Sequence, residues 1–229
     1  MASENVESWI RKYAKLARGP VLEIGARRFG EYIDVRSLFP DVRDFVGCDL
    51  EPGENVDIVL DISAPFADVN KRLGGRRFAT IFCTSVLEHI ADVFSACSNI
   101  SKLLDRGGVL FLSVPFVFRF HAYPNDYWRF TPEAVRVLFP KLNFEMHRRA
   151  GVMSTLTPGE VKSIPSSYRK RNRLIFRPRS RTGRAIRKLL KKWRPDLVRG
   201  NYSLAPTMIN MIGVKGRMGP PGGSPGQKF

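Results

Sequence analysis

Short runs of apolar residues recur along the chain, and segments with helical spacing separate most of them. The runs cover residues 21–25, 44–49, 56–61, 78–85 and 108–115. Each run is continuous rather than alternating, which predicts a strand that is buried on both faces. Strands of this kind that alternate with helices are typical of a parallel sheet with crossover connections. The pattern therefore predicts an α/β fold with a doubly wound, mostly parallel sheet.

Helices are expected between these strands, and two further strands are expected after them. The expected helices cover residues 32–39, 65–73, 92–104 and 132–139. Thr131 followed by Pro132 is a good start signal for the last helix, because the hydroxyl can cap its first turn. The two further strands cover residues 143–151 and 206–216. Near the N-terminus, apolar residues at helical spacing predict an amphipathic helix over residues 8–16, which Gly19-Pro20 ends.

The length of the chain suits one main domain. Its 229 residues, 43% of them hydrophobic, can bury one full core. We expect an N-terminal helix within residues 1–19 and a main domain over residues 20–216. A basic helical insertion of about residues 155–205 interrupts this domain before its last strand. Residues 217–229 are rich in glycine and proline, which predicts a flexible tail.

The insertion carries most of the excess positive charge. Residues 155–205 contain fifteen basic and two acidic residues, a net +13 of the +17 of the whole chain. Within it, residues 182–195 form a basic amphipathic pattern with Trp193 on the apolar face. Three interpretations remain open: a helix packed on the domain with a solvated basic rim, a surface for anionic membrane or a lipid-linked substrate, and an RNA-binding segment.

The cysteines and histidines exclude several kinds of site. Cys48, Cys83 and Cys97 are odd in number and lack C-x-x-C spacing, which argues against a disulfide framework and for a reducing, cytoplasmic compartment. The N-terminal residues show no signal peptide, and no apolar run is long enough to span a membrane. The three histidines lack ligand spacing with one another or with the cysteines, so no metal site is expected.

The loop after the first expected strand, VLEIGARRFGEY, differs from a dinucleotide-binding loop. It offers only Gly25 and Gly30, and the charge of Glu23 would oppose a pyrophosphate. A cofactor with positive charge and no phosphate fits these residues better. S-adenosylmethionine is such a cofactor, and Asp49 at the end of the second strand could hold its ribose hydroxyls. The loop therefore favours S-adenosylmethionine over a dinucleotide.

Five segments in order strengthen this interpretation: VLEIGARRFG, VGCDLEPG, DIVLDIS, FATIFCTSVLEHI and LLDRGGVLFLSVP. Together they resemble the class I S-adenosylmethionine-dependent methyltransferases, in particular the methyltransferase type 11 branch. The resemblance covers roughly residues 20–151, with 206–216 as the last strand, and implies a Rossmann-like methyltransferase fold. Arg27 departs from the pattern, since many relatives have a second glycine there. A non-catalytic binding protein of the same fold therefore stays an alternative.

The resemblance also implies a set of cofactor-binding residues at the ends of four strands. Glu23 and Gly25 would shape the methionine end of the pocket, and Asp49 would bind the ribose. Leu50 would lie against the adenine. The remaining residues would meet the adenine or close the pocket: Asp61, Ile62, Thr84 and Ser85.

The loop of residues 119–134 is the best candidate for the acceptor site. It is dense in aromatic and ionisable residues and follows the fifth strand, where the carboxyl ends of parallel strands form the binding crevice. His121 is the candidate general base for a hydroxyl acceptor, and Asp126 could orient it or take the proton itself. Tyr127 could stack on the acceptor. The alternative is an apolar lid anchor, with Trp128 and Phe130 buried and Asp126 paired with Arg129.

We therefore expect methyl transfer from S-adenosylmethionine to a small-molecule, glycan or lipid-linked acceptor. The glycan class comes from the resemblance alone, because a similar H-x-x-P-x-D-Y-W-R-F-T pattern occurs in type 11-like enzymes associated with bacterial surface glycans. The second enzyme function is methylation of RNA, with the basic insertion as the binding segment. The third candidate is the non-catalytic binding protein.

Overall fold

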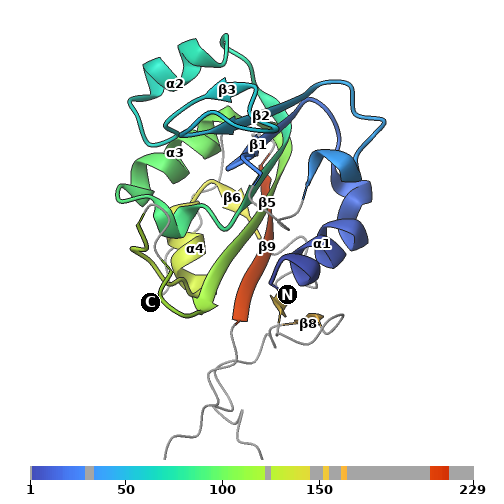
Figure 1. Cartoon of the computed structure of the whole chain (residues 1–229), viewed down its shortest axis with the longest axis vertical. Helices are drawn as coiled ribbons and strands as arrows, with labels where there is room; N and C mark the ends of the chain where they lie inside the picture. The colour runs from blue at the N-terminus through green and yellow to red at the C-terminus, as the bar shows by residue number, and fades with distance from the viewer. Residues whose placement is uncertain are drawn as a thin grey trace, which may run out of the picture. The chain divides into compact units, whose positions relative to one another are not determined.

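The computed structural model describes residues 2–28, 34–121, 125–144, 152–154, 161–163 and 207–216. These residues form an α/β fold around one sheet, which Figure 1 shows with helices on both sides. The strand order is β3 (Ile58–Val59), β2 (Phe45–Asp49), β1 (Val21–Ile24), β4 (Phe78–Thr84), β5 (Leu104–Val117), β9 (Thr207–Lys215), β7 (Val152–Ser154) and β8 (Val161–Ser163). β6 (Leu142–Asn143) also pairs with β9. The tail and almost all of the basic insertion lie outside the described residues, so the expectations for them remain predictions.

Five parallel strands form one half of the sheet. β1 (Val21–Ile24) lies between β2 (Phe45–Asp49) and β4 (Phe78–Thr84). β3 (Ile58–Val59) pairs with β2, and β5 (Leu104–Val117) pairs with β4. All of β1 and nearly all of β4 are buried, as the continuous apolar runs predicted. β3 is shorter and less buried than predicted, because it is the edge strand and has a neighbour on one side only.

The other half of the sheet is antiparallel. β9 (Thr207–Lys215) runs antiparallel to β5, which confirms the predicted last strand. β6 (Leu142–Asn143) and β7 (Val152–Ser154) pair with β9, and β8 (Val161–Ser163) pairs with β7. β6 overlaps the strand expected over residues 143–151 at Asn143, and residues 145–151 lie outside the described residues. The segment taken for a helical insertion therefore contains a strand, β8, close to its beginning.

One face of the sheet is covered by the N-terminal region. α1 (Ala2–Tyr13) continues into the 3-10 turn η1 (Ala14–Leu16). Trp9 of α1 is fully buried and packs edge-on against Phe111 of β5, with ring centroids 5.5 Å apart. The helix begins earlier than predicted because Val6 also joins this core. In place of the helix expected over residues 32–39, the described part shows only the 3-10 turn η2 (Arg36–Leu38).

Three helices cover the opposite face, as Figure 1 shows: α2 (Phe66–Arg72), α3 (Val93–Leu103) and α4 (Pro132–Leu138). Their bounds agree with the predicted helices. Asp92 caps α3 by accepting a hydrogen bond from the backbone N–H of Ser95. The hydroxyl of Thr131 caps α4 in the same way at 3.1 Å from the nitrogen of Ala134, as its sequence signal predicted. Helices on both faces confirm the doubly wound architecture.

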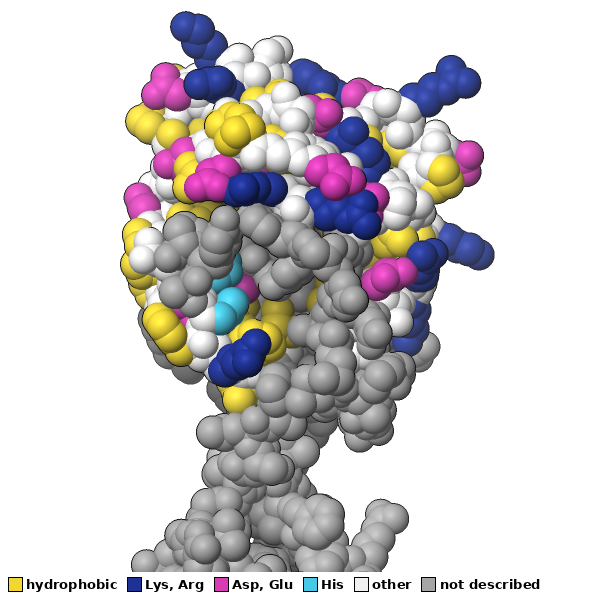
Figure 2. Space-filling model, in the orientation of Figure 1, with side chains coloured by type: hydrophobic (Ala, Val, Ile, Leu, Met, Phe, Trp, Pro, Cys, Tyr) yellow, Lys and Arg dark blue, Asp and Glu magenta, His cyan; other side chains and the backbone are white. Residues whose placement is uncertain are grey.

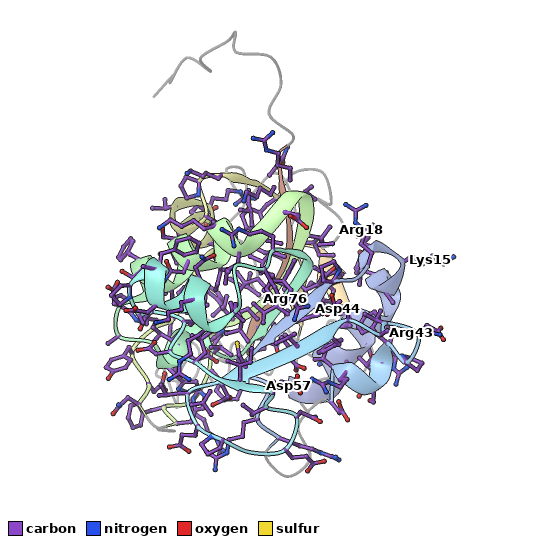
Figure 3. The ribbon with its side chains drawn as sticks, turned by 90° about the horizontal axis from the view of Figure 1, so that it is seen from above. Lys15, Arg18, Arg43, Asp44, Asp57 and Arg76 are labelled. Atoms are coloured by element: carbon purple, nitrogen blue, oxygen red, sulfur yellow. The ribbon has the colours of Figure 1, made fainter. Side chains whose placement is uncertain are left out.

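The amino edge of the sheet carries several exposed charges. Figure 3 shows Lys15, Arg18 and Arg43 reaching outward there, whereas Asp44 and Arg76 approach each other and form an ion pair between the starts of β2 and β4. These charges lie at the opposite end of the parallel strands from the candidate site described below.

The described residues contain no helix that is long and apolar enough to cross a membrane. Cys48, Cys83 and Cys97 are free and buried. Burial raises the pKa of the Cys97 thiol to about 12, so this cysteine is a packing residue rather than a reactive thiolate.

Candidate functional site

The carboxyl ends of the parallel strands bring the expected cofactor residues to one edge of the sheet. Ile24 pairs in register with Cys48 of β2 and with Cys83 of β4. The next residue on each chain segment is Gly25, Asp49 and Thr84, so these three lie at the same level of the sheet. Ligands of open α/β sheets bind at this edge.

Gly25 forms the turn that leaves β1. Its φ is +77°, a conformation that favours glycine, and its N–H donates to the carbonyl oxygen of Cys48 at 2.9 Å. A Cβ atom at this position would overlap a methyl group of Val86. The turn therefore requires glycine for its conformation and for its packing against the segment after β4.

Arg27 stands where many relatives have a second glycine, and its side chain follows the loop after β2. Its guanidinium forms an ion pair with Glu51, and its aliphatic part packs against Gly53. The backbone N–H of Arg27 donates to a carboxylate oxygen of Asp49 at 3.3 Å. Arg27 thus joins the loops after β1 and β2.

Asp49 is held by backbone donors at the end of β2. One carboxylate oxygen accepts from Arg27, and the other accepts from the N–H of Glu51 at 3.2 Å. A carboxylate has room for further hydrogen bonds, such as those from a diol. Leu50 follows with 57% of its surface exposed, so this apolar side chain is open to a flat ligand.

Glu23 is an acid buried within β1. Its side chain is 5% exposed, and its Oε2 has no hydrogen-bond partner among the described residues. Burial raises the pKa of this carboxyl to about 8, with a further upward contribution from Asp34 and a downward one from Arg36. A carboxyl oxygen without a partner is costly at this depth, and a cationic ligand could stabilise the charged form of Glu23.

Asp61 and Ile62 follow β3 and lie beside the end of β2, because the N–H of Leu60 donates to the carbonyl oxygen of Asp49 at 2.7 Å. Asp61 accepts from both the N–H and the hydroxyl of Ser63. The side chain of Ile62 is buried in the core, and Asn99 holds its carbonyl oxygen at 2.9 Å. Only the backbone of Ile62 can therefore reach a ligand at the edge.

Thr84 and Ser85 complete this edge at the end of β4. Ser85 has a φ of +55°, which is uncommon for a residue with a side chain, and its N–H donates to the carbonyl oxygen of Ser113 at 2.9 Å. The chain then turns into the 3-10 segment η3 (Leu87–His89). Backbone strain of this kind is often found at ligand sites.

A second group of polar residues lies next to this edge, where η3 meets the loop after β5. The rings of His89 and His121 pack edge-on with centroids 5.0 Å apart, and Figure 2 shows histidine side chains together at the surface. Glu88 is 1% exposed and lies beside them. Burial raises the pKa of its carboxyl to about 8.

Two hydrogen bonds fasten the loop after β5 to η3. The N–H of Tyr127 donates to the carbonyl oxygen of Glu88 at 2.8 Å, and the indole N–H of Trp128 donates to that of Ile90 at 2.8 Å. Both aromatic rings remain partly exposed, with 49% of Tyr127 and 37% of Trp128 open to solvent. The loop thus presents aromatic surface beside the histidines.

Asp126 organises this loop from within. Its carboxylate is 1% exposed and forms an ion pair with the guanidinium of Arg129. The N–H of His121 donates to Asp126 at 2.9 Å, and the Nδ1 of His121 lies 3.2 Å from the same carboxylate. The hydrogen bonds from Arg129 hold the pKa of Asp126 well below its usual range. Asp126 is therefore a poor base and a good orienting group, and the pairing with Arg129 expected of a lid anchor is present.

The closeness of Glu88 and His89 to His121 was not predicted from the sequence. No metal site was expected there, because the histidines are far apart along the chain. The order of the strands could have indicated this group, because Glu88-His89 and His121 follow β4 and β5, which are neighbouring parallel strands. Gly30, the second glycine of the loop after β1, lies outside the described residues.

Comparisons with known proteins address the fold. No family model and no curated protein sequence matches the chain. A solved S-adenosylmethionine-dependent methyltransferase from Archaeoglobus fulgidus superposes with a TM-score of 0.55 at 14% identity, covering 93% of this chain and 94% of that one. The chain has the class I methyltransferase fold. The N-methyltransferase NodS from Bradyrhizobium japonicum WM9 superposes with a TM-score of 0.50 at 12% identity, covering 93% and 96%.

Within the class I methyltransferase fold, the antiparallel strand β9 beside β5 explains why the sheet is mixed rather than wholly parallel. The α/β class is confirmed for the described residues, but the sheet is mixed rather than mostly parallel, because β9, β6, β7 and β8 all pair antiparallel. The identities are low, so the comparisons concern the arrangement of the chain, and the functional assignment depends on the site itself.

Proposed function

We propose that the chain binds S-adenosylmethionine at the carboxyl edge of β1, β2 and β4 and transfers its methyl group to a small-molecule, glycan or lipid-linked acceptor. The observation that carries this proposal is the arrangement of Gly25 and Asp49 at one edge, with Glu23 buried in β1 two residues before Gly25. A glycine turn, a carboxylate fixed by backbone donors and a buried unpaired acid suit a cofactor with a diol and a positive charge. Both structural neighbours are described as methyltransferases, which agrees with this function.

The cofactor residues have distinct roles in this proposal. Glu23 and Gly25 contact the methionine part, and Asp49 accepts hydrogen bonds from the ribose hydroxyls. Leu50 covers the adenine. The remaining positions approach the base or close the pocket: Asp61, the backbone of Ile62, Thr84 and Ser85.

In this proposal the acceptor binds against the loop of residues 119–134, which carries Tyr127. Methyl transfer is an in-line displacement, so alignment supplies much of the catalysis. Asp126 holds His121 through two contacts at 2.9 and 3.2 Å, and Arg129 keeps Asp126 ionised. His121 then acts as the base for an acceptor hydroxyl, while the exposed ring of Tyr127 supports the acceptor.

Calorimetric titration with S-adenosylmethionine and with its demethylated product tests the cofactor assignment. Asp49→Ala should weaken binding by at least about tenfold, since it removes hydrogen bonds to a charged group. Asp41→Ala is the matched control, because Asp41 is exposed before the start of β2, away from the carboxyl edge. Equal affinity in the two variants would contradict the assigned role of Asp49. If the unmodified chain bound neither compound, the enzyme function would be wrong.

Methylation of RNA is the second candidate, and the net charge of +13 in residues 155–205 favours it. RNA binding through phosphate contacts should weaken steeply as salt increases. Titration with single-stranded RNA at two salt concentrations, followed by assay of methyl transfer to the bound RNA, tests this function. If RNA did not bind, or bound equally at both salt concentrations, RNA methylation would be rejected in favour of a small-molecule, glycan or lipid-linked acceptor.

A further inference from the structure

Glu88, His89 and His121 form a group with the composition of a metal site. One carboxylate oxygen of Glu88 and one ring nitrogen from each histidine all lie within 4.8 Å of one another. Two imidazoles and one carboxylate can hold a divalent transition-metal ion and leave coordination positions open. Three ligand atoms with metal bonds of about 2.1 Å lie about 3.0–3.6 Å apart, so the side chains must draw together by up to about 1–2 Å when an ion binds.

One unpaired carboxylate oxygen of Glu88 is an independent indication of a ligand. Its side chain is 1% exposed, and its Oε2 has no hydrogen-bond partner among the described residues. Burial of an unpaired charge or polar atom is costly, and a bound cation removes that cost. The backbone hydrogen bond from Tyr127 fixes the segment that carries Glu88, so the carboxylate has a defined place.

Both histidines have the outer contacts that metal ligands usually show. The Nδ1 of His89 lies 2.5 Å from the carbonyl oxygen of Asn125. The Nδ1 of His121 lies 3.2 Å from the carbonyl oxygen of Arg119 and 3.2 Å from Asp126. Histidine ligands commonly donate their second ring N–H to a carbonyl or carboxylate, which orients the ring. With Nδ1 protonated in both residues, each Nε2 keeps its lone pair for a cation.

We propose that Glu88, His89 and His121 bind a divalent transition-metal ion and that a hydroxyl oxygen of the acceptor is a further ligand of this ion. Cation binding stands by itself, whereas the contact with the acceptor rests on the proposed methyl transfer. In this arrangement His121 is a metal ligand and no longer the base. The cation lowers the pKa of the bound hydroxyl, whose proton passes to solvent. The oxygen forms a bond with the methyl carbon, the carbon–sulfur bond breaks, and its electron pair stays on sulfur.

Binding of Mn²⁺ to the metal-stripped full chain tests the site without cofactor or acceptor. The electron paramagnetic resonance signal of free Mn²⁺ reports how much ion is bound. We expect one ion per chain, with His89→Gln and Glu88→Gln each weakening binding by more than about tenfold. Glu133→Gln, at an exposed position in the first turn of α4, is the matched control and should bind as the unmodified chain does.

Two outcomes would overturn the site. One is an unmodified chain that binds no more Mn²⁺ than His89→Gln, and the other is equal loss in Glu133→Gln. Thermal unfolding of each variant shows whether it is folded, and His89→Gln is the safer change because this histidine is only partly buried.

A second measurement tests the acceptor contact. Removal of the ion with a chelator should abolish turnover, and added Mn²⁺ should restore it, while calorimetry shows unchanged S-adenosylmethionine affinity. Turnover that persists without any ion would overturn the contact between the cation and the acceptor. Loss of cofactor binding in the ion-loaded chain would instead refute the proposed function, so the two failures are distinguishable.

Discussion

The proposed cofactor edge (Gly25, Asp49 and Thr84) and the proposed acceptor loop (residues 119–134) lie side by side, but they are built in different ways. At the cofactor edge the backbone does most of the positioning, through the turn at Gly25 and the N–H groups that hold Asp49. At the acceptor loop, side chains position one another, as in the pair of Asp126 and Arg129 and in the adjacent rings of His89 and His121. The first arrangement depends on the ends of neighbouring strands, and the second depends on contacts between two separate loops.

Because these two regions are positioned by different groups, they should respond separately to mutation. A change at the proposed cofactor edge should alter cofactor affinity, because the affected groups are those proposed to contact the cofactor. A change in the acceptor loop should alter turnover at nearly constant cofactor affinity. The largest expected effect belongs to the acceptor loop.

His121→Ala should reduce turnover by about 10²–10⁴-fold, the range of a lost general base. Loss of a metal ligand should also remove turnover. This variant therefore tests whether His121 is needed for catalysis, and does not distinguish a general base from a metal ligand. The dissociation constant of S-adenosylmethionine should stay within about twofold of that of the unmodified chain. Turnover assays together with calorimetry measure both quantities. Parallel loss of affinity and turnover would show that the two halves are not independent.

Gly25→Ala should weaken cofactor binding by about 100-fold or more. The new Cβ would overlap a methyl group of Val86, and the left-handed backbone itself costs about 1–2 kcal/mol with a side chain. Gly74→Ala is a close control, because Gly74 has a φ of +61° and a Cβ atom added there would have no neighbour within 4 Å. Thermal unfolding should show a smaller loss for Gly74→Ala, and calorimetry should show unchanged cofactor affinity. Similar unfolding temperatures for both variants would contradict the steric argument.

Glu23→Gln should have the smallest effect, visible as a change in how stability depends on pH. The pKa of Glu23 is raised to about 8 in the folded chain, so between about pH 4.5 and 8 the folded state holds a proton that the unfolded state has lost. The stability of the unmodified chain should therefore fall as pH rises through this window, by at most about 1.4 kcal/mol per pH unit for this one group. The variant should lack this contribution. Urea unfolding at pH 5, 6.5 and 8 measures the difference.

The cofactor gives an independent readout of the same residue. If the ammonium group of S-adenosylmethionine meets Glu23, its binding at pH 7 should release a proton from the unmodified chain but not from Glu23→Gln. The binding enthalpy would then depend on the ionisation enthalpy of the buffer in one protein only. If the binding enthalpy depended on the buffer equally in the unmodified chain and in Glu23→Gln, the released proton would come from a group other than Glu23.

Sequence patterns predicted the parts of the fold that depend on local signals. The apolar runs marked β4 and β9, helical spacing marked α3, and the cap Thr131 marked the start of α4. The edge strand β3 and the 3-10 turn η2 were less predictable, because their extent depends on neighbours rather than on periodicity. β8 was missed because its residues carry no strand pattern of their own.

The residues of the candidate site also differ in whether local sequence signals could predict them. Glu23, Gly25 and Asp49 could be found from the sequence because each stands at a fixed place relative to an apolar run. The group of Glu88, His89 and His121 could not, since nothing along the chain states how the turn after β4 meets the loop after β5. The backbone hydrogen bond from Tyr127 to Glu88 fixes that contact and exists only in the folded chain.

The position of β9 has a consequence for how the chain folds during synthesis. β9 comes late in the sequence, yet it lies between β5 and β7, and Asn210 on it accepts a buried hydrogen bond from Ser113 across a separation of 97 residues. Until the ribosome has released residues 207–215, one edge of β5 has no partner, and an unpaired edge can associate with other chains. The basic insertion, residues 155–205, leaves the ribosome during this interval. Its positive charge would repel the same segment of another nascent chain and so help to prevent association through the unpaired edge.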